Sequence, residues 1–159
     1  MALPADFTPG SLYVAGFTQA STAPHIALII PTDAQSGGLV HIRIDRATSP
    51  NWTYQFRVQR ITGDMFLSSL LRIHDASSGQ ITVDQLQDAA SAVAVPEHGE
   101  FGACAPWVHA VIQELHNRGL IILSDIAALA DEVHAFATGS RAFARRDRFP
   151  NVAVSQFCS

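Results

Sequence analysis

The feature that most constrains this chain is a series of five short, strand-like segments in its first half, joined by connections of only a few residues. Aliphatic, β-branched and aromatic side chains dominate each segment, as is typical of strands. The segments are Leu12–Phe17, His25–Ile30, Leu39–Ile44, Tyr54–Ile61 and Leu67–Ile73. Connections this short join antiparallel neighbours, because parallel neighbours need a longer crossover. The first half therefore predicts an antiparallel sheet of about five strands.

The second half has the residue spacing of helices. Thr82 fits the N-cap of a short helix, and Pro106 fits the first turn of a second one, where its missing N–H costs nothing. Gly119 is the residue type that ends such a helix, and Asp125 fits the start of a third. Residues 151–157 are expected to form an edge strand or a docked tail. We therefore expect all 159 residues to form one α+β domain, in which about three helices follow the sheet.

The composition excludes several classes of protein. Apolar residues make up 48% of the chain and charged residues 15%, which is typical of a globular domain and not of a disordered one. A net charge of −4 without a basic stripe argues against a nucleic-acid partner. Four arginines near the C-terminus are more typical of a helix end than of a phosphate site: Arg141, Arg145, Arg146 and Arg148.

The sequence also gives expectations about location and cofactors. The N-terminal residues have neither the basic nor the apolar region of a signal peptide, and the longest apolar runs are only strand-sized. We therefore expect a cytoplasmic protein without a membrane span, in which Cys104 and Cys158 are thiols. The sequence contains no Cys-x-x-Cys pair and no histidine-rich cluster, so neither a metal nor another cofactor is expected.

Cys104 is the residue whose position most suggests chemistry. It lies in the segment Phe101-Gly-Ala-Cys-Ala-Pro-Trp, where a loop passes into the second predicted helix. Unpaired N–H groups and the positive end of the helix dipole favour a thiolate there, and the small neighbours leave the backbone open to a substrate. A buried free cysteine is also a common core residue, so inert packing stays open as the alternative.

An activated thiol needs a base, and two of the seven histidines are placed to supply one. His25 begins the second predicted strand and His41 lies on the third. In a hairpin centred near Asp33, residues whose numbers sum to about 66 face each other, and this pair satisfies that sum. One imidazole can then act as the base while the other orients it. The alternative is a structural role, in which each ring binds backbone carbonyls.

Two further residues lie close to Cys104 in the sequence and are expected to contact the substrate. His98 precedes the cysteine in the loop, and Trp107 follows it and can wall a pocket beside the thiol. We expect His109 and His134 on helix surfaces or partly in the core.

The order of these residues resembles the circularly permuted papain-like superfamily, in which strand histidines precede a cysteine that opens a helix. Three motifs carry the resemblance: Pro24-His25-Ile-Ala-Leu-Ile-Ile, Leu39-Val-His41-Ile and Gly102-Ala-Cys104-Ala-Pro-Trp107-Val. The superfamily includes lecithin–retinol acyltransferase-like enzymes and PPPDE-type isopeptidases, and a group of small fungal proteins looks similar. The polar residue usual before the cysteine is replaced by Ala103. The resemblance implies a permuted papain-like fold with His25 and His41 serving Cys104.

The sequence therefore predicts a thiol-dependent hydrolase or acyltransferase that acts on an amide, ester or thioester carbonyl of a small-molecule, acyl or peptide substrate. Cys104 attacks, His25 takes its proton and His41 orients His25, while backbone N–H groups near the cysteine hold the oxyanion. Two alternatives remain: a small biosynthetic cyclase or isomerase that forms no covalent intermediate, and a non-catalytic binding module on the same fold.

Overall fold

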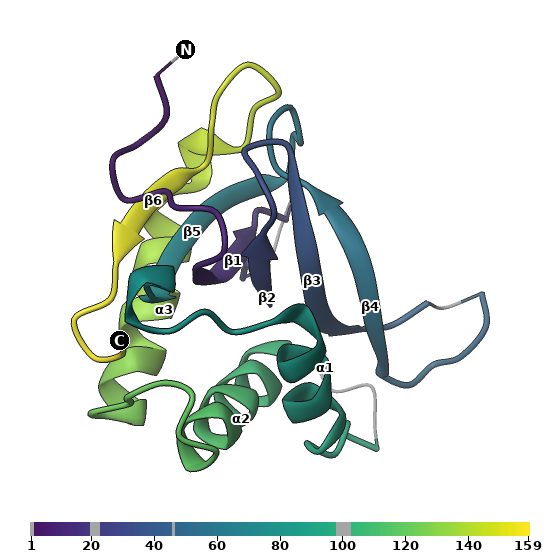
Figure 1. Ribbon diagram of the computed structural model, residues 1–159. Coiled ribbons are helices and arrows are strands. Elements are labelled where there is room, and N and C mark those ends of the chain that lie inside the picture. The colour runs from purple at the N-terminus through teal and green to yellow at the C-terminus, as the bar shows by residue number, and fades with distance from the viewer. Residues whose placement is uncertain (1, 20–22, 46, 98–102) are drawn as a thin grey trace.

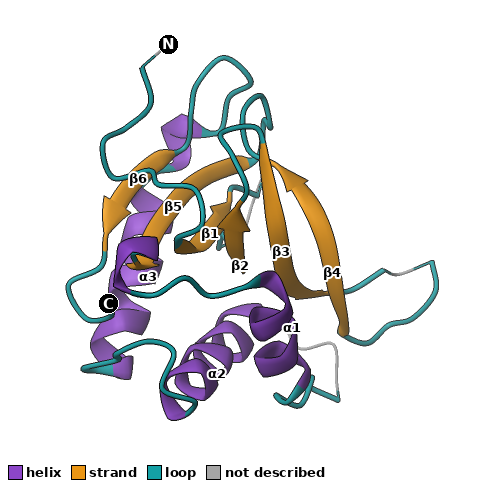
Figure 2. Ribbon diagram, viewed as in Figure 1, coloured by secondary structure: helices purple, strands orange, loops and turns teal. Residues whose placement is uncertain are grey.

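The computed structural model describes residues 2–19, 23–45, 47–97 and 103–159. Among these residues, six strands form one sheet in the order β4-β3-β2-β1-β5-β6 (Figure 1). The strands are β1 (Leu12–Phe17), β2 (His25–Pro31), β3 (Ser36–Arg43), β4 (Thr53–Arg60), β5 (Leu67–His74) and β6 (Asn151–Val154). The described part also holds the helices α1 (Val83–Ser91), α2 (Cys104–Asn117) and α3 (Ile126–Gly139), and the short 3₁₀ helices Ala76–Ser78 and Arg141–Phe143. Figure 2 shows α1 and α2 below the sheet and α3 beside it.

This architecture confirms the predicted α+β class, but the sheet is mixed and not purely antiparallel. β1 to β5 pair with antiparallel neighbours, as the short connections predict. β6 lies parallel to β5, with Ser69 opposite Asn151 and Arg72 opposite Val154. The chain reaches this edge only after passing through all three helices, and a long crossover of this kind permits a parallel pair. Of the two expectations for the C-terminal segment, the edge strand is therefore correct for residues 151–154.

The connection from β4 to β5 forces the sheet to curl. Only residues 61–66 join these two strands, although β3, β2 and β1 lie between them in the sheet. The curl brings the inner faces of β4 and β1 together, so that the Arg57 guanidinium lies 5.9 Å from the centre of the Phe17 ring. One end of the curled sheet, where β1 ends and β2 begins, carries the site described below (Figure 1).

Two apolar cores lie on the two faces of the curled sheet. Successive side chains of a strand point to opposite faces. On β2, Ala27 and Ile29 therefore pack inside the curl, whereas Leu28 and Ile30 pack outside it against the helices. This alternation places the His25 side chain on the inner face and that of its neighbour Ile26 in the core beneath the helices.

The helix boundaries follow the predicted capping residues. The Gln85 N–H donates to the Thr82 hydroxyl oxygen at 3.1 Å, and the Thr82 N–H donates to the Gln85 side chain at 2.9 Å. Asp125 caps α3 in the same manner. α2 begins at Cys104 without a side-chain cap, because its N-cap residue Ala103 has no polar group. The first N–H groups of α2 therefore have no intrahelical acceptor and no side-chain cap from residue 103.

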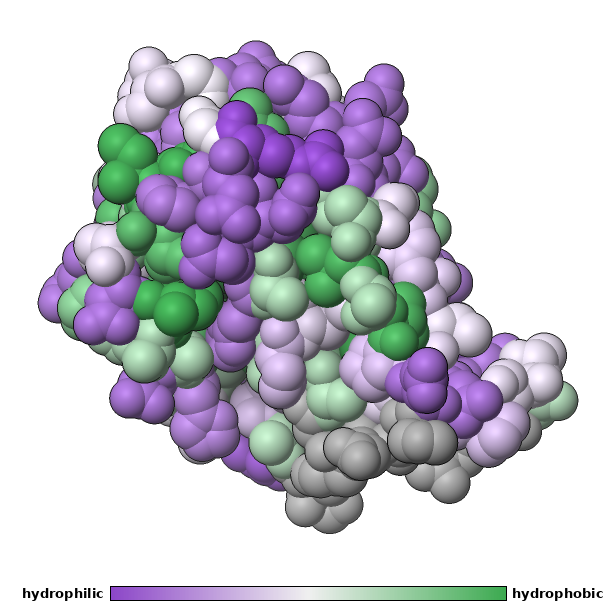
Figure 3. Space-filling model, turned by 90° about the horizontal axis from the view of Figure 1, so that it is seen from below, coloured by the Kyte–Doolittle hydropathy of each residue, from purple (hydrophilic) through white to green (hydrophobic). Residues whose placement is uncertain are grey.

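Large apolar residues on the surface are scattered. Figure 3, a view from below Figure 1, shows hydrophilic residues surrounding smaller hydrophobic patches. The exposed members of this class are Leu3, Phe56, Val58, Met65, Phe66, Ile122 and Val154. Within the described residues, no helix has both the length and the apolar character that crossing a bilayer requires.

Candidate active site

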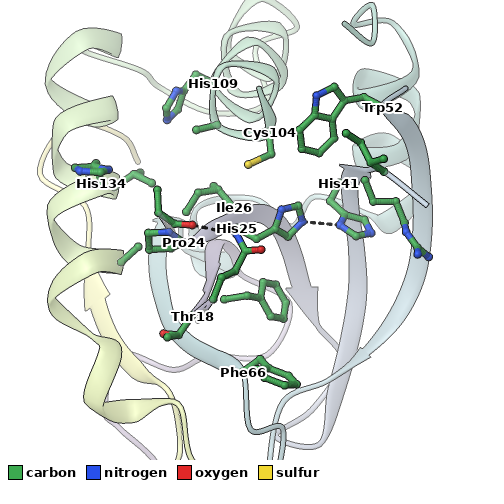
Figure 4. A pocket seen from close by; sticks show the side chains of 18 of the residues that line it. Thr18, Pro24, His25, Ile26, His41, Trp52, Phe66, Cys104, His109 and His134 are labelled. Carbon is green, nitrogen blue, oxygen red and sulfur yellow. Dashed lines mark hydrogen bonds between the residues drawn. The ribbon is translucent and has the colours of Figure 1, made fainter. Parts of the chain in front are cut away.

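A pocket of about 860 Å³ lies at the end of the sheet where β2 begins (Figure 4). Its described lining comes from β1 to β4, from the start of α2 and from α3. The three residues predicted to carry the chemistry, Cys104, His25 and His41, all line it. His98, predicted to contact the substrate, lies outside the described residues. The fold thus brings together one helix residue and two strand residues that are far apart in the sequence.

His25, His41 and Gln55 form a chain of hydrogen bonds along one wall of this pocket. His25 Nε2 lies 2.8 Å from His41 Nδ1, and His41 Nε2 lies 2.8 Å from Gln55 Oε1. An amide oxygen only accepts, so with Oε1 facing the ring His41 carries its proton on Nε2. His41 Nδ1 then accepts from the His25 Nε2–H. The lone pair of His25 is therefore on Nδ1, the position from which it can take a proton.

The histidine contact is the one that the hairpin arithmetic predicts, although the register differs. The observed partners, such as Leu28 opposite Val40 and Ile29 opposite Leu39, have numbers that sum to 68 and not to 66. A shift of two residues keeps each side chain on its face, whereas a shift of one would reverse it. His25 and His41 are consequently diagonal neighbours, which are still within reach of each other on an antiparallel pair.

Burial holds both imidazoles in their neutral form. The pKa of His25 falls from 6.5 to about 4, first because the ring is removed from water and second because the Arg57 cation lies nearby. The pKa of His41 also falls to about 4, and burial is again the largest cause. The hydrogen bond to Gln55 acts against this shift, while His25, Arg57 and Arg43 add to it. At neutral pH the pair is an uncharged base with its tautomers set by Gln55.

Cys104 is the first residue of α2 and only 6% exposed. Burial raises the pKa of its thiol, and the backbone N–H groups of Ile26, Ala105 and Cys104 itself offset this only in part. The expectation of a thiolate favoured by the helix start is therefore wrong for the resting protein, because removal from water outweighs the helix terminus. Figure 4 shows the sulfur pointing from α2 toward the strand that carries Ile26 and His25.

The thiol and the proposed base face the same space without being bonded to each other. Between the two described residues Cys104 and His25, the structure contains no hydrogen bond, and neither group shifts the pKa of the other. The resting site is thus a neutral thiol beside a neutral imidazole, and not an ion pair. We expect the contact between the thiol and the imidazole to form when the substrate binds, because catalytic hydrogen bonds often tighten only in the enzyme–substrate complex.

Two residues of the wall were not predicted. Gln55, which ends the hydrogen-bond chain, faces His41 directly in the pairing of β3 with β4, so the same hairpin arithmetic applied to that connection would have found it. Trp52 lines the pocket, whereas Trp107, which was expected there, does not. The Trp107 side chain is 2% exposed and packs in the core, with its ring centre 6.0 Å from that of Tyr54. Three residues beyond Cys104, the helix has turned Trp107 toward α1 and β4.

The helices add two histidines to the lining. His109 of α2 and His134 of α3 both line the pocket (Figure 4). As expected, His134 is exposed and His109 is partly buried. His109 Nε2 is buried without a hydrogen-bond partner, and burial lowers the pKa of its ring. No group of three His, Cys, Asp or Glu side chains within the described residues is arranged to hold a metal ion. The described lining holds four histidines, Arg43 and Arg57, and it includes no acidic residue.

Comparison of the chain with protein-family models, with curated proteins and with solved structures found no match.

Proposed function

We propose that the protein is a cysteine-dependent hydrolase or acyltransferase acting on an amide, ester or thioester carbonyl. The observation that carries the proposal is the hydrogen-bond chain from Gln55 through His41 to His25, which ends at a free lone pair in the same pocket as Cys104. A nucleophile, a base and a group that orients the base are the components that covalent acyl transfer needs.

In the first step, the Cys104 sulfur attacks the substrate carbonyl carbon while its proton passes to His25 Nδ1. Because the resting thiol is neutral, proton transfer accompanies attack, as it does when an alcohol is the nucleophile. The positive charge that forms on His25 is shared with His41 through the bond between their rings, and Gln55 holds His41 in place. This hydrogen-bond chain from Gln55 through His41 to His25, called the relay below, stabilises the protonated form of His25. It thereby offsets part of the loss of basicity that burial causes.

The carbonyl oxygen becomes an oxyanion, and we propose that the first N–H groups of α2 bind it. Those of Cys104 and Ala105 have no acceptor within the helix and lie at the Cys104 sulfur, beside the carbon that it attacks. Collapse of this intermediate returns the proton from His25 to the leaving group and leaves a thioester on Cys104. Water, or a second acceptor in a transferase, then attacks the thioester, with His25 again taking the proton.

The lining indicates which substrates suit this pocket. Apolar side chains such as those of Ile44, Trp52, Phe66 and Val133 alternate with the histidines around it. An acyl chain or a small peptide can pack against them, and no described feature suits a nucleic acid. We place the reaction in the cytoplasm, because Cys104 and Cys158 are both free thiols. The layout also agrees with a permuted papain-like fold, which we propose on the strand–strand–helix order of the three residues.

The direct test is to trap the acyl-enzyme. The protein is mixed with p-nitrophenyl acetate, quenched in acid, digested, and analysed by mass spectrometry for an acetyl group on each cysteine. We expect acetylation of Cys104, none in Cys104→Ala, and slower acetylation in His25→Ala. Cys158→Ala is the matched control, because that thiol is also buried and its pKa is raised to about 12. Acetylation confined to Cys158, or a rate unchanged in His25→Ala, would overturn the proposal.

One observation favours a second function, an acid–base cyclase or isomerase without a covalent intermediate. The relay from Gln55 to His25 is complete without the thiol, and the raised pKa of Cys104 keeps that thiol protonated. In this case Cys104→Ala would retain turnover of the natural substrate while His25→Ala would lose it. The same two variants therefore separate the two functions.

A further inference from the structure

Two arginines line the pocket on the wall made by β3 and β4, and among the described residues no acid forms an ion pair with either. Arg43 ends β3 and Arg57 lies on β4, and both side chains are half-buried. In the described part of the chain, the ion pairs are Arg72–Asp75, Arg118–Glu114 and Arg145–Asp147, all outside the pocket. Arginine in a protein stays charged, so the described lining of the pocket holds two positive charges and no acid, in a chain whose net charge is −4.

The surroundings of Arg57 are unfavourable for a lone cation. Its Nε is buried without a hydrogen-bond partner, and the Phe17 ring below its guanidinium offers a weak cation–π attraction but no hydrogen-bond acceptor for this N–H. Asp64, whose charge acts on Arg57, is already engaged, because its carboxylate accepts the N–H groups of Phe66 and Leu67 and the side-chain amide of Gln59. Arg43 adds a repulsion that, together with burial, lowers the pKa of Arg57. A buried donor on an unpaired cation is costly unless something else accepts from it.

We infer that Arg43 and Arg57 bind an anionic group of the substrate, a carboxylate or a phosphate. Guanidinium groups match both anions in shape and hydrogen bonding. The inference rests on the proposed function for its position in the reaction: the anion sits on the strand wall while the reacting carbonyl sits at Cys104 on the helix wall. The substrate class is therefore an acyl compound that carries a negative charge.

An anion at this position also acts on the base. Arg57 lowers the pKa of His25, and Arg57 and Arg43 both lower that of His41. A bound negative charge offsets these cations, so the pKa of His25 rises when the substrate is present. The substrate itself would then make His25 a stronger base. The pKa of His25, measured with and without a bound anion, can therefore be followed without any turnover.

The kinetic test compares substrates that differ in one charge. Methyl p-nitrophenyl adipate is compared with mono-p-nitrophenyl adipate for the carboxylate, and S-acetylpantetheine with its 4′-phosphate for the phosphate. Each ratio of kcat/KM, charged over neutral, is divided by the ratio of the uncatalysed rates. We expect at least one corrected ratio of about tenfold or more, the gain typical of charge-assisted hydrogen bonds. The larger ratio identifies the anion.

The variants assign this preference to the two arginines. Arg57→Gln and Arg43→Gln should bring the charged-over-neutral ratio toward one, and Arg57→Lys should retain part of it because the charge remains. Arg60→Gln is the matched control: it lies on β4, is exposed and does not line the pocket. Corrected ratios near one in the wild type, or an equal loss in Arg60→Gln, would overturn the inference.

A binding measurement separates this inference from the proposed function. Glutarate and inorganic phosphate are titrated into the protein while NMR follows the His25 ring; we expect the His25 pKa to rise in the wild type and not in Arg57→Gln. If no acyl-enzyme forms but an anion raises this pKa, the proposed function fails and the anion site stands. If an acyl-enzyme forms but neither anion binds and both corrected ratios are near one, the anion site fails and the proposed function stands.

Discussion

Acid should destabilise the folded protein through His25 and His41, because the fold buries both rings in their neutral form. Their pKa values are about 4 in the folded state against 6.5 in a chain exposed to water. Between these two values the unfolded chain binds more protons than the folded one. The free energy of unfolding is therefore highest above pH 6.5, falls as the pH drops, and has lost the full contribution at about pH 4.

The size of the loss follows from the pKa difference. The step from 6.5 to about 4 is worth about 3 kcal/mol for one histidine, since each pH unit corresponds to about 1.4 kcal/mol. The two rings are in contact and repel each other when charged, so they titrate as a coupled pair and together account for about 3–6 kcal/mol. That is a large fraction of the roughly 5–15 kcal/mol that keeps a typical domain folded.

Urea unfolding, followed by tryptophan fluorescence at pH values between about 7 and 4.5, measures this loss. The double variant His25→Gln/His41→Gln should lose less stability over the same range, by the amount worked out above. The buried His109 titrates in the same direction in both proteins and cancels in the comparison. His134→Gln, which removes an exposed ring, is the control. If the wild type and the double variant lose equal stability, the two histidines are not buried as neutral groups and the reasoning is refuted.

The rate of p-nitrophenyl acetate hydrolysis should stay level from neutral pH to about pH 5 and fall below it, because His25, with a pKa of about 4, stays neutral until then; a fall centred near pH 6.5 would contradict the buried base. Gln55→Leu should lower kcat by about tenfold or more with little change in KM. Gln55→Glu, which keeps the acceptor and adds a negative charge, should move the acidic limb of the rate profile to higher pH; identical pH–rate profiles in all three proteins would exclude Gln55 from the relay. Gly16→Ala should lower the free energy of unfolding by about 1–3 kcal/mol, because the added Cβ meets the Ser69 hydroxyl. Thermal unfolding checks this against Gly139→Ala, which has open space around it and should be neutral or stabilising.

The parts of the fold that the sequence predicts correctly depend on local chemistry. The strands are recognised by their own side chains, and Thr82 and Asp125 by the caps they form. β6 depends on the free edge of β5, which lies far away in the sequence, so no local pattern distinguishes a parallel strand from a docked tail. Gly37 and Gly38 are paired in β3, where Gly37 allows close approach to the Ile30 carbonyl. The paired residues have numbers that sum to 68, so the hairpin is centred at residue 34, one residue later than the expected centre at Asp33.

The site shows the same division between local and distant effects. The contact between His25 and His41 is predictable because the alternation of strand side chains survives a shift of two residues. The protonation state of Cys104 is not, because it depends on how deeply the folded chain buries the sulfur and not on the residues beside it in the sequence. The closeness of Arg57 to Phe17 also escapes a reading of the sequence. The two side chains line one pocket because the sheet curls.

The histidine relay lies within one continuous stretch, from His25 to Gln55, whereas Cys104 arrives on a separate helix. Three successive strands can therefore assemble the base and set its tautomers before α2 docks, since these contacts close only short loops. The division also separates two routes by which the chemistry can diverge. A replacement at position 104 changes or removes the nucleophile and leaves the base intact, whereas replacements along β3 and β4 alter basicity and substrate charge without touching the helix. A lineage built on this fold can in this way exchange covalent for non-covalent chemistry by a single substitution.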